Sequence, residues 1–412
     1  MTTYKIEGTT EPGRRLIAMA EEFAADFATR AEQHDNEGSF PFENLQALRD
    51  SGYLYGPIPR EYGGMGVESV HDALVASSRL AEGDASLTLG VNMHQTLLLS
   101  LARQWRIACN RENGPRAAAL GGVMKRIVDE RDVIAAAVSE PDQELTRQQT
   151  RATRDGESWI VNGRKIFASM APGATLFTTS FGYTDDEGVE RYAWSLIPRD
   201  TPGITVNDDW DALGMRASGS VSLVFKDVAL PFPPGRGAIA GTITADFLEP
   251  WLTSGPAHAS ASLGVAERAQ ELAVGIVAAR RERKGDDSVR ATIRHIAAEN
   301  AIDLAAARAV FARALQIIDA YNDGHPSGIG TLEETSAVYA EAQRAKAFMN
   351  QAAVRIVDRA MTIAGGASYA SKHPLSRLYR DARAGAFMHP LGANLAYEYI
   401  GAQALGITPT NL

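Results

Sequence analysis

The sequence has a single cysteine, Cys109, among its 412 residues. One thiol excludes a disulfide within the chain and a metal cluster built from several thiolates, and we predict no metal site. No apolar run reaches the ~18 residues that a membrane-spanning helix needs, and the N-terminus lacks the apolar stretch of a signal peptide. These absences predict a cytoplasmic protein with no membrane partner.

Positive charge is also sparse. Lysine and arginine total 41 against 50 acidic residues, a formal net charge of −9, and the densest basic run is only 280–284. This balance argues against nucleic acid and anionic membranes as partners. The glycine-rich turn at 61–66 neither follows a predicted strand nor has the GxGxxG spacing, and no other nicotinamide-binding motif occurs.

What is present divides the chain into three parts, and the length suits two or three domains. Residues 1–135 are predicted to be helical, because Leu16, Met19, Phe23 and Phe27 recur at helical spacing. Residues 136–235 have the short apolar runs and turn residues of a small β domain. Residues 236–412 are again helical. The predicted fold class is therefore α+β, mainly helical.

Turn residues predict how the central strands connect. Residues 159–161 precede Asn162-Gly163, a pair typical of a tight hairpin turn. Residues 176–183 and 191–197 flank the polar turn 185–188, which predicts a second hairpin, and residues 221–230 form a further candidate strand.

The last part carries long apolar stripes, which predict helices packed as a bundle. One stripe comprises Val265, Ala269, Leu272 and Ile276, and another comprises Leu304, Ala307, Phe311, Leu315 and Ile318.

Five motifs, in this order along the chain, resemble those of the acyl-CoA dehydrogenase family. They are Val138-Ser139-Glu140-Pro141, Asp155-Gly156 with 161–169, Leu213-Gly214-Met215-Arg216 with 224–228, Gly365-Gly366, and Arg380-Asp381-Ala382. The resemblance covers nearly the whole chain. It implies an N-terminal helical domain, a central β domain and a C-terminal four-helix bundle.

The resemblance also implies a flavin site. In the family, the segments that match Val138 and Ser139, and Phe167, Ala168 and Ser169, line the flavin. Arg281 stands where the family places an arginine near the cofactor of a neighbouring subunit, and Gly365 and Gly366 belong to the matching C-terminal motif. The phenylalanine that usually follows that arginine is missing, which leaves both FMN and FAD open.

The catalytic base of the family is absent from both of its usual places. The position of the C-terminal glutamate holds His389, and the alternative position, at the start of the predicted bundle, holds Ser254. A dehydrogenase must remove a proton next to a thioester, which requires a base within reach. This departure resembles a branch of the family, the two-component flavin-dependent monooxygenases exemplified by dibenzothiophene monooxygenase and the amino-sugar nitrososynthases.

In that branch, reduced flavin from a separate NAD(P)H:flavin reductase reacts with O2 to give a C4a-hydroperoxide that oxygenates a small substrate. The resemblance implies three catalytic residues, His94, Ser169 and His389. Imidazole can hold or pass a proton near neutral pH, and a serine hydroxyl both donates and accepts. Structural alternatives stay open, since His94 lies on an apolar stripe and Ser169 can simply end a strand. The resemblance further implies a homotetramer.

Two other functions stay open at this point. One is an acyl-CoA dehydrogenase with FAD and a displaced base, and the other is a non-catalytic scaffold member of the family. The substrate, an aromatic, heteroaromatic or amine compound, is not defined by the sequence, because residues from several helices shape the pocket.

Overall fold

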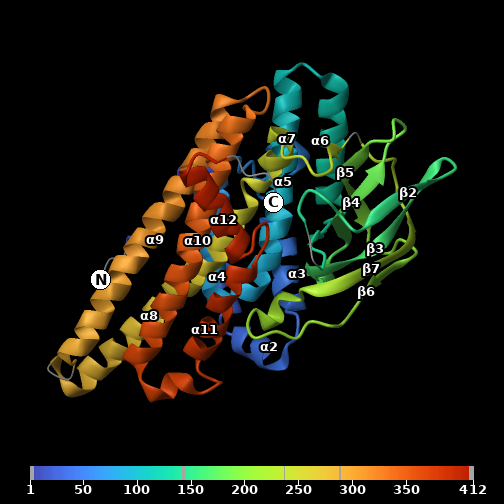
Figure 1. Cartoon of the computed structure of the whole chain (residues 1–412). Helices are drawn as coiled ribbons and strands as arrows, with labels where there is room; N and C mark the ends of the chain where they lie inside the picture. The colour runs from blue at the N-terminus through green and yellow to red at the C-terminus, as the bar shows by residue number, and fades with distance from the viewer. Residues whose placement is uncertain (1–3, 142–143, 236, 287–288, 408–412) are drawn as a thin grey trace.

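The computed structural model describes residues 4–141, 144–235, 237–286 and 289–407. Two groups of helices flank the chain's one described β-sheet in sequence, and in space the sheet lies to one side of the packed helices (Figure 1). The N-terminal helices are α1 (Glu11–Phe27), α2 (Ala31–Glu37), α3 (Phe42–Asp50), α4 (Val70–Gly83), α5 (Ala85–Asn110) and α6 (Gly114–Asp129), with short 3-10 turns η1 (Tyr53–Tyr55) and η2 (Arg60–Tyr62).

The predicted stripe of α1 is confirmed. Leu16 and Phe27 are fully buried, and Met19 and Phe23 pack against the same core. Thr10 directly precedes the helix as its N-cap, and its side chain accepts a hydrogen bond from the Gly13 amide, as a residue in this position commonly does. The apolar face of α1 therefore lies on α4, which is buried along most of its length.

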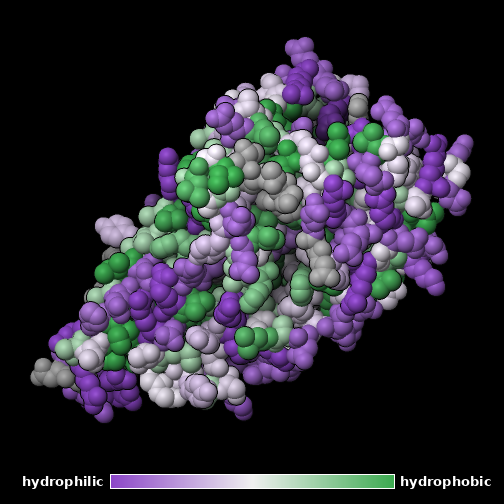
Figure 2. All heavy atoms as spheres, viewed as in Figure 1, coloured by the Kyte–Doolittle hydropathy of each residue, from purple (hydrophilic) through white to green (hydrophobic). Residues whose placement is uncertain are grey.

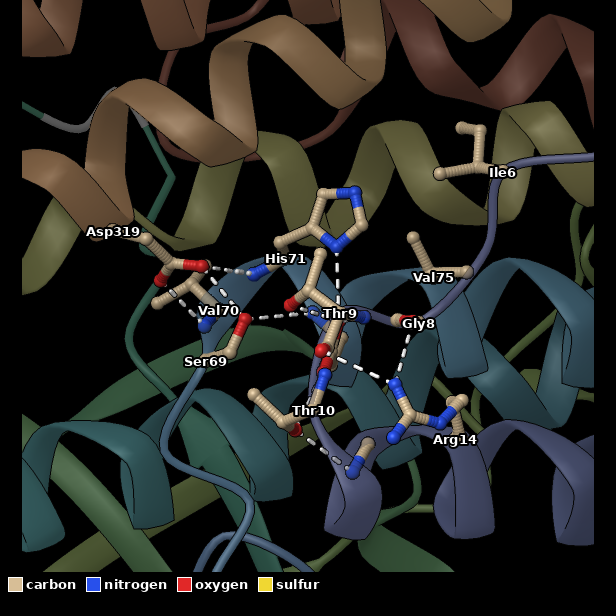
Figure 3. A network of polar contacts seen from close by, with 12 residues as sticks. Ile6, Gly8, Thr9, Thr10, Arg14, Ser69, Val70, His71, Val75 and Asp319 are labelled. Atoms are coloured by element: carbon tan, nitrogen blue, oxygen red, sulfur yellow. Dashed lines mark hydrogen bonds and ion pairs between the residues drawn. The ribbon is translucent and has the colours of Figure 1, made fainter.

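Two carboxylates join helices in this region. Asp72 is buried and fastens the N-terminal segment to α4, and Asp319 fastens the start of α4 to a C-terminal helix (Figure 3). Asp72 accepts hydrogen bonds from the backbone N–H groups of Thr9 and Thr10, both at 2.8 Å, and from both threonine hydroxyls. Asp319 accepts from the Ser69 hydroxyl at 2.7 Å and from the first two amides of α4. Since a helix start leaves amides without partners, Asp319 stabilises α4 from another helix.

Within the described residues, the central sheet has eight strands. They are β1 (Ile134–Ala137), β2 (Arg151–Asp155), β3 (Ser158–Ala168), β4 (Leu176–Thr184), β5 (Glu190–Pro198), β6 (Ile204–Val206), β7 (Val221–Ala229) and β8 (Ala238–Ile239). Their order is β6-β7-β3-β2-β4-β5-β8, and β1 pairs with β4 in parallel. The predicted β4–β5 hairpin is confirmed, with Thr184 opposite Glu190.

The hairpin turn predicted at Asn162-Gly163 is wrong. β3 runs straight through these residues, and the turn lies earlier, between Asp155 and Ser158, where Gly156 has φ +60°. The pairing of β3 with β7 shifts between Val161 and Gly163. Gly163 is required for space, because a Cβ atom there would lie 2.4 Å from the Thr150 hydroxyl oxygen. The glycine thus permits a close strand approach rather than a turn.

The remaining helices are α7 (Ala245–Leu248), α8 (Ser254–Lys284), α9 (Ala291–Gly324), α10 (Leu332–Ala364), α11 (Pro374–Ala384) and α12 (Ala393–Ala404). The turns between them and in the sheet region are η3 (Ala171–Gly173), η4 (Arg216–Ser218), η5 (Glu249–Trp251), η7 (Gly366–Tyr369) and η8 (Gly385–Phe387). The α9 stripe is confirmed, because all five predicted residues are buried, and α8, α9 and α10 pack along one another.

Hydrophilic residues dominate the outer side of the sheet and the far ends of α8 and α9 (Figure 2). Across the described residues, every helix is too short or too polar to traverse a bilayer.

Candidate active site

A cavity of about 1210 Å³ lies between the helices and the sheet. Its wall combines α5, α6, the ends of β1 and β3, strands β4 and β5, the first turns of α8, and residues 387–390. These last belong to residues 385–391, here called the His389 segment. Most of the lining side chains are apolar, among them Leu97, Phe181, Trp194 and Trp251. The volume exceeds the 300–1,000 Å³ typical of a site for one small ligand, so there is room for a flavin ring and a substrate together.

Two side chains of α10, one helical turn apart, hold the His389 segment by its backbone. Asn350 Nδ2 donates to the carbonyl of Gly385 at 2.7 Å. Lys346 Nζ, almost fully buried, donates to three carbonyl oxygens of the segment, those of Met388 (2.5 Å), His389 (3.2 Å) and Leu391 (2.7 Å). Three bonds use all three protons of the ammonium group. Burial nevertheless lowers the pKa of Lys346 to about 7.

His389 lines the cavity and packs on Trp251, with ring centroids 4.8 Å apart. Its Nε2 atom is buried and has no hydrogen-bond partner among the described residues. Burial, together with the charges of Lys346 and Lys165, lowers the pKa of His389 to about 3. The ring is therefore neutral at physiological pH, with one nitrogen able to donate and the other to accept.

Ser169 follows β3 and also lines the cavity. Its hydroxyl lies 2.7 Å from that of Ser220, which is 2.7 Å from that of Ser218, so the three hydroxyls form a chain. The backbone just before it is unusual, because Phe167 has φ +58°, a conformation that non-glycine residues rarely adopt. This turn sends the Phe167 side chain, 58% exposed, toward the cavity, edge-on to Trp210.

A buried ion pair fixes the neighbouring segment that carries Val138 and Ser139. Lys165 Nζ lies 2.7 Å from a carboxylate oxygen of Glu140, and both side chains are fully buried. Glu140 also accepts from the amides of Gln149 (2.6 Å) and Thr150 (2.8 Å). Burial lowers the pKa of Lys165 to about 8, and the Glu140 charge opposes that shift. A further bond, from the Ile166 amide to the Ser139 carbonyl at 2.9 Å, brings the two predicted flavin segments together.

Four of the five residues predicted on these two segments line the cavity, namely Val138, Ser139, Phe167 and Ser169. Ala168 is fully buried in the core of the sheet instead. The four give the cavity wall an aliphatic side chain, an aromatic ring and two serine side chains. A flat aromatic ring system with polar edges can pack on the first two and bond to the hydroxyls, so the residues present fit a flavin.

His94 lies outside the lining of the cavity. It is fully buried on α5, its ring meets Tyr55 edge-on, and its Nδ1 accepts the Ile134 amide at 3.1 Å. Burial lowers its pKa to about 4. The contact ties α5 to β1, whereas Ser169 and His389 share the cavity wall.

Arg281, Gly365 and Gly366 are remote from the cavity of their own chain. Arg281 stands near the end of α8, roughly 40 Å along the helix from Ser254 at 1.5 Å per residue, and pairs with Asp286. Gly365 and Gly366 are exposed where α10 ends.

Sequence reasoning missed two polar residues of the site. His258 lines the cavity from α8, one turn after Ser254, and is only 5% exposed. Neither of its ring nitrogens has a hydrogen-bond partner among the described residues. Its spacing of four from Ser254 was a usable signal, since both side chains then share one helix face. Lys346 gave no such signal, because its partners are backbone carbonyls more than forty positions away.

Carboxylates are scarce in the wall. Among the described lining residues Glu140 is the one acidic side chain, and it is bound to Lys165. Glu249 is buried nearby in the chain but pairs with Arg103 at 2.6 Å.

Three family descriptions match the sequence in the order of its three parts. They are the acyl-CoA dehydrogenase N-terminal domain at residues 10–105, the middle domain at residues 135–228 and the C-terminal domain at residues 254–393. Together they span more than half of the chain.

Individual relatives cover nearly its full length. Amino sugar nitrososynthase DnmZ of Streptomyces peucetius is 33% identical over 97% of this chain and 95% of its own. The crystal structure of a nitrososynthase from Micromonospora carbonacea var. africana superposes with a TM-score of 0.87 at 30% identity, over 97% of this chain and 98% of that one. KijD3, crystallised with FMN and dTDP-3-amino-2,3,6-trideoxy-4-keto-3-methyl-D-glucose, superposes at 0.90 and 31% identity, over 100% and 98%. These similarities support an oxidoreductase that uses flavin.

Proposed function

The chain belongs to the acyl-CoA dehydrogenase family, and we propose that it is a two-component flavin-dependent monooxygenase of that family. It takes reduced flavin from a separate NAD(P)H:flavin reductase and uses O2 to oxygenate a small substrate, with an amine nitrogen as the first candidate. The observation that carries the proposal is the set of polar side chains that line the cavity. Where a dehydrogenase needs a carboxylate base, this wall presents neutral imidazoles and serine hydroxyls.

The relatives support the choice of substrate and flavin. A nitrososynthase is 33% identical over 97% of the chain, and KijD3 was crystallised with FMN and a nucleotide-linked 3-amino sugar. FMN is therefore the first flavin to test. The 3-amino sugar nucleotide of the KijD3 complex is the first substrate to test and is called the amino-sugar probe below.

The chain's own residues supply binding, orientation and exclusion of water. Val138, Ser139 and Phe167 would hold the flavin ring, and the chain of serine hydroxyls that starts at Ser169 would offer it hydrogen bonds. When bound, reduced flavin supplies two electrons and activates O2, so that one oxygen atom enters the substrate and the other leaves as water. His389 presents its unpartnered Nε2 to the substrate and holds or passes a proton there. The apolar wall excludes water that would divert the reaction.

Ala168, Arg281, Gly365 and Gly366 enter the proposal in different ways. Ala168 would act indirectly, because it is buried in the core of the sheet next to Phe167 and Ser169. The other three are too far from the cavity of their own chain, so they would contribute to flavin binding only from a second copy. We propose a homotetramer. His94 acts at a distance, by holding α5 against β1.

A flavin titration tests the proposal against its rivals. The purified protein is titrated with oxidised and reduced FMN and FAD, and oxygen is then admitted with the amino-sugar probe. We expect tight binding of the reduced form, no NADH consumption by the chain alone, and an oxygenated probe. Bleaching of bound oxidised FAD by an acyl-CoA indicates a dehydrogenase with a displaced base instead, and no affinity for either redox state indicates a scaffold.

His389 variants test the role of the imidazole. We expect His389→Ala and His389→Glu to retain reduced-flavin binding but to lose roughly 10²- to 10⁴-fold in product formation, the usual contribution of general acid–base help. Oxygen is then diverted to hydrogen peroxide, so the measurement is the ratio of product to peroxide. Full coupling in His389→Ala contradicts the assignment, and acyl-CoA oxidation by His389→Glu favours the dehydrogenase.

A further inference from the structure

We propose that His258 is a second substrate-contacting residue, which together with His389 binds an uncharged nitrogen of the substrate in the cavity. The inference rests on the proposed function and deepens it, since it defines the protonation state in which an amine is bound.

The geometry singles out His258. Its ring lines the cavity from the second turn of α8, is only 5% exposed, and leaves both nitrogens without a partner among the described residues. His389 lines the same cavity, and its buried Nε2 atom also has no hydrogen-bond partner among the described residues. Buried polar atoms without partners destabilise the folded state, so two such rings facing one cavity indicate polar atoms of a ligand between them.

The other buried histidines, which lie outside the cavity, each bond through at least one ring nitrogen. His94 does so through Nδ1 alone, since its Nε2 has no partner among the described residues. His34 is 7% exposed, and both its ring nitrogens are engaged, one with the Ser39 hydroxyl and the other with Glu43, each at 2.8 Å. The ring of His71 bonds to Asp72 at 3.0 Å. His258 has no comparable contact in the described chain, although it is buried as deeply.

The charges around the two rings favour an uncharged group. Lys346 lies behind the His389 segment, its positive charge lowers the pKa of His258 and of His389 in addition to the effect of burial, and both rings are neutral. Lys165 acts on His389 from β3, but its charge is paired with Glu140. Glu249, from η5, is likewise bound to Arg103.

An ammonium group entering this site would therefore meet the buried cation Lys346. The one carboxylate among the described lining residues, Glu140, is already paired with Lys165. A free-base amine meets no such repulsion. Its N–H groups can donate to one imidazole nitrogen while its lone pair accepts from another, or stays available for attack on oxygen. The free base is also the nucleophilic form that an N-oxygenation needs.

Binding measurements on three variants test the role of His258. Full-length protein with FMN is titrated calorimetrically with the amino-sugar probe, using His258→Phe to keep volume, His258→Gln to keep a donor and an acceptor, and His295→Gln as a control on the exposed face of α9. We expect binding about tenfold weaker in His258→Phe, the effect of one or two lost hydrogen bonds, and within about threefold of wild type in the other two. The melting temperature of His258→Phe should equal or exceed that of wild type.

A structural role gives the reverse pattern, a lowered melting temperature with unchanged binding in His258→Phe, and that result overturns the proposal. The outcome is distinguishable from failure of the proposed function. If wild-type protein oxygenates the probe but His258→Phe binds it equally well, only this inference fails. If wild-type protein neither binds nor oxygenates the probe, both fail.

The protonation state is tested by comparing the probe with its analogue in which a hydroxyl replaces the amine. Below the pKa of the free amine, binding of the probe should weaken about tenfold for each unit of falling pH. The hydroxyl analogue corrects for titration of Lys346 and Lys165, whose pKa values are lowered to about 7 and about 8, and it should bind the protein without that dependence. Equal slopes for the two compounds overturn the assignment of an uncharged amine.

Discussion

Replacing Lys165 by methionine should loosen the segment that carries Val138 and Ser139 while leaving the rest of the fold intact. The substitution keeps the length of the side chain but removes the ammonium group that faces Glu140 at 2.7 Å. It also removes the bonds from Nζ to the Val138 carbonyl at 3.2 Å and the Gln148 side-chain oxygen at 2.8 Å. The carboxylate of Glu140 then stays buried without its cation.

The size of the effect follows from that unpaired charge. Removing one partner of a buried ion pair typically destabilises by about 3–5 kcal/mol. The amides of Gln149 and Thr150 still donate to Glu140, which places the expectation at the low end, about 3 kcal/mol. A local opening favoured by that amount exposes the two amides roughly 100-fold more often.

Hydrogen exchange at Gln149 and Thr150 is the assay, because it reports opening of this segment even if the whole chain does not unfold in one step. The double variant Glu140→Gln/Lys165→Met should recover most of the protection, since the pair is then neutral. Lys125→Met is the matched control, because its partner Asp129 is exposed and such pairs contribute about 1 kcal/mol or less. Exchange in Lys165→Met within about threefold of wild type, or a double variant worse than the single one, would refute the reasoning.

Three further predictions concern stability and assembly. Acid should destabilise the fold, because His94, His258 and His389 are neutral with lowered pKa values, whereas histidines of the unfolded chain are protonated near pH 6.5. The stability lost between pH 7.5 and 5.5 is roughly 4 kcal/mol, partly offset by Asp381, whose pKa burial raises to about 6. Urea unfolding midpoints at the two pH values measure this loss. Asp72→Ala should cost about 3 kcal/mol, since four donors from the N-terminal segment lose a buried acceptor, and a melting temperature equal to that of wild type contradicts this. Light scattering with FMN bound should give about four times 44.2 kDa, whereas a particle of 44.2 kDa at micromolar concentration contradicts the tetramer.

Much of the fold could be predicted because burial imposes a period on the sequence. The α9 stripe that includes Phe311 is buried as expected, since a helix that packs on one side repeats its apolar residues every three to four positions. The Asn162-Gly163 prediction failed for a local reason. That dipeptide suits a tight turn, but a glycine equally permits close contact between chain segments. The Thr150 side chain that decides between them comes from the residue just before β2.

The candidate site was predictable only where a family motif named the residue. Ser169 and His389 share the cavity wall as the motifs led us to expect, although catalysis by either stays a prediction. Lys346 donates hydrogen bonds to a segment distant in sequence, and its charge lowers the pKa of His258 on another helix. The spacing of His258 from Ser254 places both on one helix face. Whether the imidazole finds a partner, or an ammonium is buried among carbonyls, depends on packing between segments distant in sequence.

Because α10 holds the His389 segment by its backbone, the position of the segment does not depend on which side chains it carries. Lys346 and Asn350 bind the segment through its main-chain carbonyl oxygens, and every amino acid offers the same carbonyl. Phe387 and Met388 face the cavity, so they can be exchanged for larger, smaller or more polar residues while their backbone stays fastened. Evolution, or an engineer, can therefore change the substrate range of this enzyme one side chain at a time while α10 keeps the backbone of the segment in place.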